Sequence, residues 1–198
     1  MSTETYKGKL FYVIGPSGAG KDTLINYARQ NIAAGTPVLF AHRYITREVD
    51  HTGENHIELS HTEFKVRKAQ GLFALDWESH ENKYGIGIEI NFWMENGMNV
   101  VMNGSRGYLE KAVEKYPELR VILISVSEQV LWHRLKSRGR ENDQEIEKRI
   151  ERSREFNDLA IDDNQVIHIK NDSSIEEAGK IFLDAIKSGV MISSVASE

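Results

Sequence analysis

The segment Gly15-Pro16-Ser17-Gly18-Ala19-Gly20-Lys21-Asp22 lies between an apolar run and a stretch with helical spacing. Its glycines let the backbone curl until successive N–H groups face one anion, and the N-terminus of the following helix adds partial positive charge. A lysine placed as Lys21 is reaches the β- and γ-phosphates of a bound nucleotide. Because the spacing, the preceding strand and the following helix agree, the segment predicts a P-loop for ATP rather than a chance glycine turn.

Asp22 occupies the position at which most P-loops carry the serine or threonine that contacts Mg²⁺. A carboxylate is also a hard oxygen ligand, so Asp22 is predicted to hold Mg²⁺, directly or through water. Thr23 is the last residue of the predicted ATP-binding segment, although its side chain comes one position late and is expected to point elsewhere. The alternative interpretation is that Asp22 prevents catalysis and leaves a nucleotide-binding scaffold.

Outward from the loop, short apolar runs predict buried parallel strands, whose hydrophobic residues are continuous rather than alternating. The runs are Leu10–Ile14, Val38–Ala41, Val100–Met102, Val121–Val126 and Val166–Ile169. Amphipathic stretches separate them. This alternation predicts an α/β chain with the three-layer P-loop NTPase fold and a five-stranded parallel sheet.

The chain is expected to form one domain over residues 1–198, with a core at about 8–47 and 88–190. The stretch at about 48–87 mixes short β-like pieces with a helix, which Ser60 and Glu63 are predicted to cap, and is interpreted as a substrate-binding insertion. The last helix is predicted to start after Ser173 or Ser174. Residues of about 138–150 are expected to form a mobile lid.

The charge balance argues against a nucleic-acid partner, because 25 Lys and Arg face 30 Asp and Glu, a net charge of −5. No cysteine is present, which excludes disulfides and thiolate metal sites. No apolar run approaches the ~20 residues of a membrane span. A cytoplasmic protein without a membrane partner is therefore expected, and a homodimer is compatible with the sequence.

Four arginines cluster around the predicted lid, at Arg134, Arg138, Arg140 and Arg149. Phosphoryl transfer gathers negative charge between donor and acceptor, and planar guanidinium groups bind such charge bidentately. Arg138 and Arg149 are therefore predicted to be catalytic together with Lys21, and Arg134 to contact ATP. The alternative is solvated helix charge, which for Arg134 is as plausible, with Glu145 and Arg149 forming an ordinary surface pair.

With these features in place, the chain resembles the guanylate kinase family over nearly its whole length. The matching segments are the loop Gly15–Lys21, Thr46-Arg47, Tyr84-Gly85, Arg138 to Arg149, and Asn171-Asp172. The resemblance implies a guanylate kinase-like fold, an acceptor phosphate held near Arg47 and Tyr84, and Asn171 beside the adenine of ATP.

The departures from that family are informative. Leu75 and Asn103 replace acidic residues that would hold guanine, while Asp50 and Ile57 fall where a second arginine and a tyrosine are expected. A site that has lost its polar partners should also have lost its preference for that base.

The chain is more similar to a narrower group, the ribose 1,5-bisphosphate phosphokinases of phosphonate catabolism. The matching segments are residues 15–22, 41–47, 54–57, 84–90, 103–106 and 138–142. The resemblance implies transfer from ATP, with Mg²⁺, to ribose 1,5-bisphosphate, giving 5-phospho-α-D-ribose 1-diphosphate. Such an acceptor oxygen is already largely ionised, so no general base is needed.

The acceptor is expected to contact residues of two kinds. Arg43, Arg47 and Tyr84 are predicted to hold its phosphates, although Arg43 is also plausible as a surface charge and Tyr84 as a packing aromatic. Its hydroxyls or 1-phosphate are predicted to meet Asn55, His56, Asn103, Ser105 and Arg106. For Asn103 and Ser105 the alternative is a role in shaping the turn after a strand.

Other interpretations remain open from the sequence. A nucleoside monophosphate kinase, most plausibly a guanylate kinase with an unusual site, is the first, and a non-catalytic nucleotide-binding module is the second. A zinc site is not expected, because the spacing of His51, His56, His61 and His80 matches no usual ligand pattern.

Overall fold

The computed structural model describes residues 7–48, 56–79, 81–139, 141–154 and 162–188. Its main sheet has five parallel strands in the order β2-β7-β1-β8-β9. The strands are β1 (Leu10–Ile14), β2 (Val38–Phe40), β7 (Asn99–Asn103), β8 (Arg120–Ser125) and β9 (Val166–Lys170). All five predicted strands are thus confirmed, with ends shifted by at most one residue.

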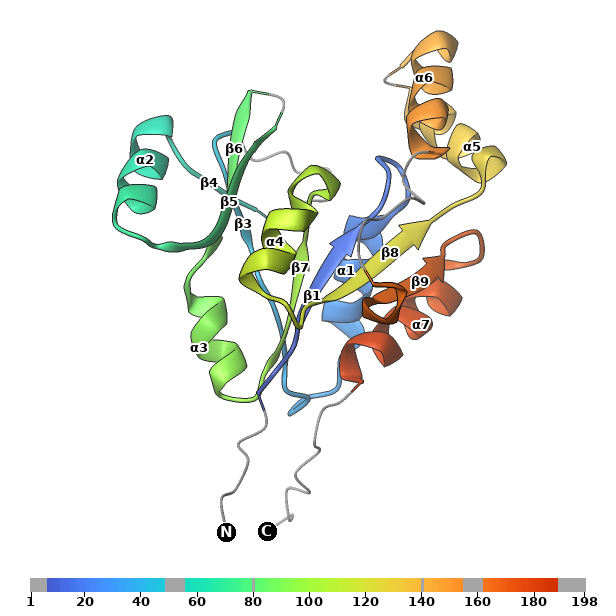
Figure 1. Ribbon diagram of the computed structural model, residues 1–198. Coiled ribbons are helices and arrows are strands. Elements are labelled where there is room, and N and C mark those ends of the chain that lie inside the picture. Colours follow the sequence, from blue (N-terminus) through green and yellow to red (C-terminus); the bar gives the residue numbers. More distant parts are fainter. Residues whose placement is uncertain (1–6, 49–55, 80, 140, 155–161, 189–198) are drawn as a thin grey trace.

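Helices cover both faces of this sheet, which makes the three predicted layers (Figure 1). Successive residues of β1 point to opposite faces, so Leu10, Tyr12 and Ile14 pack in one core with α3 and α4. Phe11 and Val13 pack in the other core with α1 and α7. The helices are α1 (Lys21–Asn31), α3 (Glu89–Glu95), α4 (Leu109–Lys115) and α7 (Ile175–Lys187).

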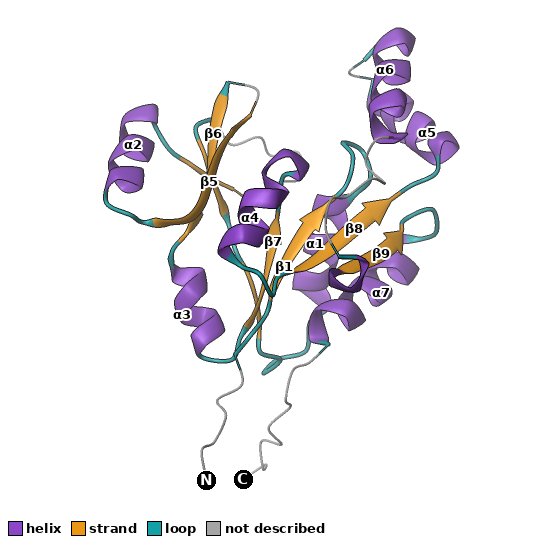
Figure 2. Cartoon of the chain, in the orientation of Figure 1, coloured by secondary structure: helices purple, strands orange, loops and turns teal. Residues whose placement is uncertain are grey.

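A second sheet has four strands in the order β4-β3-β6-β5 and stands beside the first (Figure 2). It consists of β3 (Arg43–Ile45), β4 (His56–Glu58), β5 (Phe73–Ser79) and β6 (Asn82–Gly87). Phe64 of α2 (His61–Ala69) packs against Phe73 and Leu59 and so covers its outer face. We call residues 43–87 the acceptor arm. The insertion was expected to begin near residue 48, but its sheet already includes β3, which pairs with β4 and β6 rather than with the main sheet.

On the other side of the main sheet, α5 (Glu128–Arg138) and α6 (Asp143–Arg154) form a pair that we call the lid arm. Gly139 ends α5 with φ +63°, a backbone conformation that residues other than glycine rarely adopt. Two 3₁₀ turns, η1 (Arg106–Tyr108) and η3 (Asp163–Gln165), complete the described elements.

The predicted helix caps are present where the residues are described. Ser60 Oγ accepts a hydrogen bond from Glu63 N at 3.1 Å. The last helix uses Ser174, which accepts from Glu177 N, so the alternative start after Ser173 is wrong. Short polar side chains satisfy helix N–H groups that have no partner within the helix, and this local chemistry makes such starts readable from sequence.

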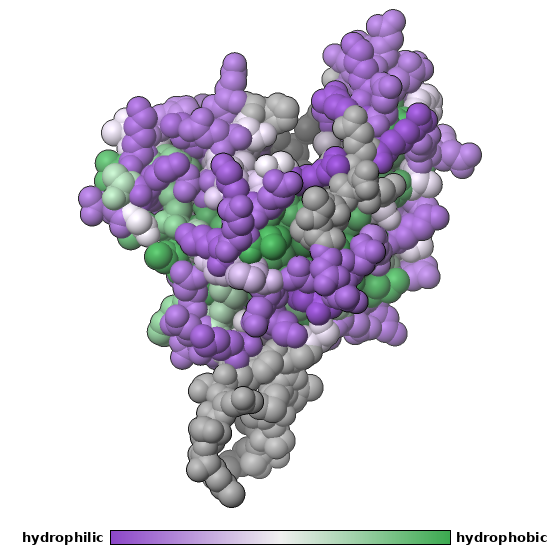
Figure 3. Space-filling model, viewed as in Figure 1, coloured by the Kyte–Doolittle hydropathy of each residue, from purple (hydrophilic) through white to green (hydrophobic). Residues whose placement is uncertain are grey.

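On the face seen in Figure 3, most residues of the lid arm are hydrophilic. Within the described residues, no helix is long and apolar enough to cross a membrane.

Candidate active site

The phosphate loop connects β1 to α1 at the carboxyl edge of the main sheet. Gly18 and Gly20 have φ values of +93° and +90°, and Ala19 N donates to Pro16 O at 3.1 Å. A Cβ on Gly15 would lie 2.4 Å from the carbonyl oxygen of Ile124 in β8. The loop therefore needs glycine both for its turn and for its close contact with the neighbouring strand.

Lys21 begins α1 and lies over the loop. Its Nζ donates to the carbonyl oxygens of Gly15 and Pro16, at 2.7 and 3.2 Å. This position holds one cation against the backbone of the loop, where the motif predicts that a phosphate binds. Thr23 follows with an exposed side chain.

Asp22 meets the end of the neighbouring strand β7. Asn103 Nδ2 donates to Asp22 Oδ1 at 2.6 Å, and Asn103 is only 8 % exposed. The oxygen of the same amide, Asn103 Oδ1, is buried and accepts no hydrogen bond from the described residues. Carboxylate and amide oxygens suit Mg²⁺, so this corner fits the predicted metal.

The side of the loop at Ala19 is braced by two of the predicted ATP-binding residues. Asn171 Nδ2 donates to Ala19 O at 2.7 Å, and Arg134 Nη2 donates to Asn171 O at 2.9 Å. Burial lowers the pKa of Arg134, and the nearby Arg138 acts in the same direction. Arg134 thus packs against the loop rather than standing on an open helix surface, while the side chain of Arg138 is exposed.

The lid arm reaches the loop through Arg149. Its Nη1 donates to Ser17 Oγ at 2.7 Å, and its guanidinium also pairs with Glu141. Glu145 instead accepts from the backbone of Asn142 at the start of α6, so the alternative surface pair with Arg149 is replaced by the pair with Glu141. Arg140 lies outside the described residues.

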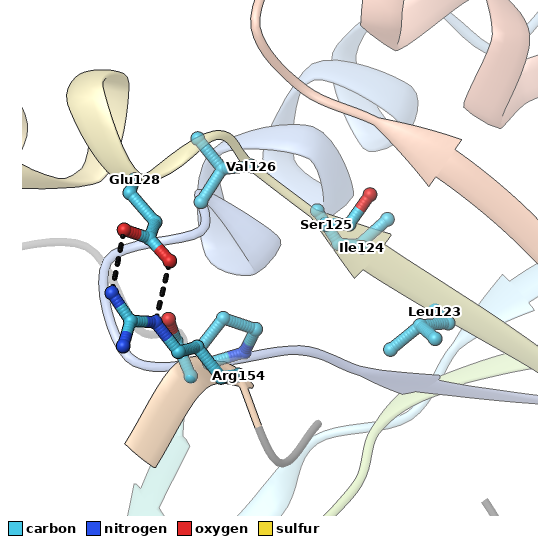
Figure 4. A pocket seen from close by; sticks show the side chains of 8 residues that line it. Leu123, Ile124, Ser125, Val126, Glu128 and Arg154 are labelled. Carbon is cyan, nitrogen blue, oxygen red and sulfur yellow. Dashed lines mark hydrogen bonds and ion pairs between the residues drawn. The ribbon is translucent and has the colours of Figure 1, made fainter. Parts of the chain in front are cut away.

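A second ion pair joins the two lid helices beside the loop (Figure 4). Arg154 Nε and Nη2 donate to Glu128 Oε1 and Oε2 at 2.6 and 3.0 Å. This pairing holds the pKa of the Glu128 carboxyl below its usual range. The two residues line a pocket of about 110 Å³ that Pro16 and the end of β8 complete. Ligand pockets usually have about 300–1,000 Å³, so we assign no substrate to it.

The acceptor arm presents a stack of aromatic rings. Trp77 and Tyr84, which are cross-strand neighbours, stack with ring centroids 5.4 Å apart and an interplanar angle of 4°. Tyr108 stacks on Trp77 at 5.5 Å, and the Arg43 guanidinium carbon lies 5.5 Å from the centroid of the Tyr84 ring. Cation–π attraction and stacking therefore order Arg43 and Tyr84 together.

The strand pairing brings three predicted acceptor residues to one face of the arm. Arg43 is paired with His56 on one side and Ile86 on the other, and residues directly opposite in a sheet share a face. Tyr84 lies two residues before Ile86 and points the same way. Leu75, where the resemblance to guanylate kinases leads us to expect an acidic residue, is opposite Ile86 and 1 % exposed, so this side chain belongs to the core.

The remaining predicted acceptor residues are less closely grouped. Arg47 is exposed, and its carbonyl oxygen lies 3.3 Å from Nε2 of the buried His56. Ser105 and Arg106 are half-buried and follow β7. Asn55 lies outside the described residues.

Tyr12 is a contributor that sequence patterns did not indicate. Its hydroxyl donates to Ser105 O at 2.9 Å and accepts from Ser105 N at 3.0 Å, and burial raises its pKa. It pins the turn after Asn103. A tyrosine inside an apolar strand carries no sequence signal for this role. The described residues contain no group of three or more His, Asp or Glu side chains placed to share a metal ion.

Comparisons with known proteins show which sequences and folds this chain is similar to. No family model matches the chain. A ribose 1,5-bisphosphate phosphokinase PhnN of Thiobacillus denitrificans is 51% identical over 174 residues, 88% of this chain and 90% of that protein. Proteins of the same name from Desulfomicrobium baculatum and Psychromonas ingrahamii are 51% and 49% identical, over 87% and 91% of this chain and 90% and 91% of theirs.

Among solved structures, guanylate kinase from Anaplasma phagocytophilum superposes with a TM-score of 0.66 at 17% identity. The match covers 96% of this chain and 89% of that chain. At this identity the likeness shows the fold, and the predicted guanylate kinase-like architecture is confirmed.

Proposed function

The chain belongs to the ribose 1,5-bisphosphate phosphokinase family, and we propose that it transfers the γ-phosphoryl group of ATP to ribose 1,5-bisphosphate. The products are ADP and 5-phospho-α-D-ribose 1-diphosphate. A new P–O bond forms between an acceptor phosphate oxygen and the γ-phosphorus as the bond to ADP breaks.

The donor side of this mechanism consists of the phosphate loop and the lid arm. Loop N–H groups and Lys21 bind the phosphates, while Arg149, with Arg138, stabilises the charge that develops on the transferred group. Arg134 and Asn171 hold the loop in shape through Ala19. Bound through Asp22, Mg²⁺ would neutralise charge on the β- and γ-phosphates.

The acceptor side consists of Arg43, Arg47 and Tyr84 for the phosphates, with His56, Ser105 and Arg106 near the sugar. Asn55 lies outside the described residues, and its contact with the sugar stays a prediction from the sequence. The stack that orders Arg43 above Tyr84 is the observation that carries this assignment. Since a phosphate oxygen attacks, alignment and charge stabilisation suffice without a base. We also propose that the lid arm closes during transfer and that the enzyme works in the cytoplasm.

A guanylate kinase activity is the competing function. Leu75 is buried among apolar side chains and offers no polar group to a base. A site that lacks the required hydrogen-bond partner discriminates strongly against such a substrate.

The decisive experiment measures ADP release with ATP and Mg²⁺, in parallel with ribose 1,5-bisphosphate and with GMP, and identifies the diphosphate product by phosphorus NMR. We expect turnover with the sugar and little with GMP. Fast turnover with GMP would identify a nucleotide kinase instead. No turnover with either would contradict the proposal and favour another acceptor or a non-catalytic module.

A further inference from the structure

Asp22 and Asn103 are 81 residues apart in sequence and meet because two strands are neighbours. In the parallel pair of β1 and β7, Val13 is opposite Asn103. The chain leaves β1 through the phosphate loop and returns in the first turn of α1, where Asp22 lies. The donor Asn103 Nδ2 and the acceptor Asp22 Oδ1 are 2.6 Å apart.

Compared with a common P-loop arrangement, the carboxylate and the neutral polar group of this pair have exchanged places. P-loop NTPases hold Mg²⁺ with a serine or threonine of the loop and an aspartate on a strand. Here the carboxylate is on the loop helix, and the neutral polar group is at the end of the strand next to β1. The pair still carries one negative charge, but on the loop helix instead of on the strand.

The second amide atom of Asn103 points to a ligand. Asn103 Oδ1 is buried, and it accepts no hydrogen bond within the described residues. A buried acceptor without a partner costs free energy, and such atoms call for a bound group or water. A residue that only shaped the turn after β7 would not need this oxygen directed into the protein beside the loop.

We propose that Asp22 and Asn103 form one magnesium-binding unit. Asn103 Nδ2 fixes the Asp22 carboxylate, and Asn103 Oδ1 accepts a hydrogen bond from a water molecule of the hydrated ion. Mg²⁺ keeps several waters in such sites, so an amide oxygen is a suitable partner. Asn103 is then a positioning residue for the metal, not a ligand of the sugar. The inference rests on the proposed function only in requiring a magnesium nucleotide.

The test measures nucleotide binding without any acceptor. Calorimetry gives the affinity for the β,γ-imido analogue of ATP with Mg²⁺ and with EDTA, and the ratio is the magnesium gain. Loss of groups that orient metal ligands typically costs about 10–100-fold, so Asn103→Ala should lower this gain by about 10-fold or more. Its affinity in EDTA should stay at the wild-type value.

A double variant supplies the rescue. Asp22→Ser alone should remove most of the magnesium gain, because the carboxylate is lost. Adding Asn103→Asp puts a carboxylate on the strand and a hydroxyl on the loop, and should restore the gain to within about 10-fold of wild type. Electron paramagnetic resonance can measure Mn²⁺ binding in the presence of the analogue, and the Mn²⁺ affinities should rank the variants in the same order as the magnesium gain.

Asn96→Ala is the matched control, because Asn96 is an exposed asparagine that follows α3 and donates to the Phe92 carbonyl. An unchanged magnesium gain in Asn103→Ala, with only the Michaelis constant (KM) for the sugar raised, would overturn the proposal. If Asn103→Ala does not fold, a folded double variant without a magnesium gain would overturn it equally. A wild-type protein that shows the gain but no turnover with ribose 1,5-bisphosphate would refute the proposed function and leave this inference standing.

Discussion

Arg43 shows how one residue acquires a defined position from its surroundings. On a strand end it looks like a solvated charge, but its guanidinium lies over Tyr84, which in turn stacks on Trp77. A planar cation held over an aromatic ring has already lost much of its rotamer freedom and binds phosphate at a lower entropic cost.

We therefore expect Arg43→Ala to raise the KM for ribose 1,5-bisphosphate by about 10–100-fold, since a hydrogen bond to a charged group contributes about 1.5–3 kcal/mol. The KM for ATP should stay near wild type. Arg67→Ala is the matched control, because Arg67 lies over Tyr44, whose ring packs in the core on the outer face of the same sheet. Equal sugar KM values in the two variants would contradict the role given to Arg43.

His42 is a residue whose environment predicts a pH effect on stability. Burial lowers its pKa, Arg29 acts in the same direction, and Glu89 opposes them. The unfolded chain therefore takes up a proton at higher pH than the folded one, and stability falls as the pH drops below about 6.5. Urea unfolding between about pH 8 and pH 5 should show this fall in wild type and a smaller one in His42→Gln. If the unfolding free energies of the two proteins fall in parallel with pH, His42 is not the source of the fall.

At the scale of elements, the β5–β6 hairpin brings Trp77 against Tyr84 and so connects packing to acceptor binding. Trp77 is only 7 % exposed and belongs to the core, yet one face of its ring sets the plane of Tyr84. Besides filling the core, Trp77 therefore has a positioning role through this stack.

Trp77→Leu should raise the sugar KM by about 10-fold, because stacking contributes about 0.5–1.5 kcal/mol and its loss frees both Tyr84 and Arg43. Trp77→Phe keeps an aromatic face and should stay closer to wild type. Trp93→Leu, in the same core but without this stack, is the control for lost packing. If the sugar KM rises in both leucine variants in proportion to their loss of thermal stability, then Trp77 has only a packing role.

Within the lid arm, Arg149 of α6 donates a hydrogen bond to Ser17 of the loop. Arg149→Ala removes the contact with Ser17 and a cation from the transfer site. We expect kcat to fall by about 100-fold or more, with ATP affinity changed less, since groups that stabilise transition-state charge act mainly on kcat. Arg152→Ala, on the same helix and bonded to the Lys148 carbonyl, should keep wild-type kcat. Equal losses in both variants would point to helix stability instead.

At the scale of the whole molecule, Asn99 joins three distant parts of the chain. It is fully buried, and its Oδ1 accepts from Lys9 N while its Nδ2 donates to Ile186 O, both at 2.9 Å. The start of β1, the start of β7 and the end of α7 are thereby tied together at the edge opposite the loop.

Asn99→Ala leaves one buried and one partly buried backbone group without this partner and should lower the free energy of unfolding by about 2–4 kcal/mol. Asn96→Ala loses only an exposed hydrogen bond and should lower it by about 1 kcal/mol or less. Denaturant unfolding measures both. Catalytic constants of folded Asn99→Ala should match wild type, and a loss of activity at full folding would contradict a purely structural role.

Local patterns were enough for much of this protein. The phosphate loop, the five strands of the main sheet and the caps at Ser60 and Ser174 are all set by residues within one turn or one strand of each other, so their chemistry is readable along the chain. The family was readable from short motifs in the same way, and the loss of guanine contacts at Leu75 stays a prediction from the sequence.

Tertiary structure decided the contacts that depend on strand order and register. The pairing of β3 with β6, the ring stack on Trp77, the Asp22–Asn103 pair, and the bonds of Tyr12 and Asn99 all join residues far apart in sequence. No local preference encodes such contacts, because burial of both sheets against their helices determines which strands become neighbours and which side chains then meet.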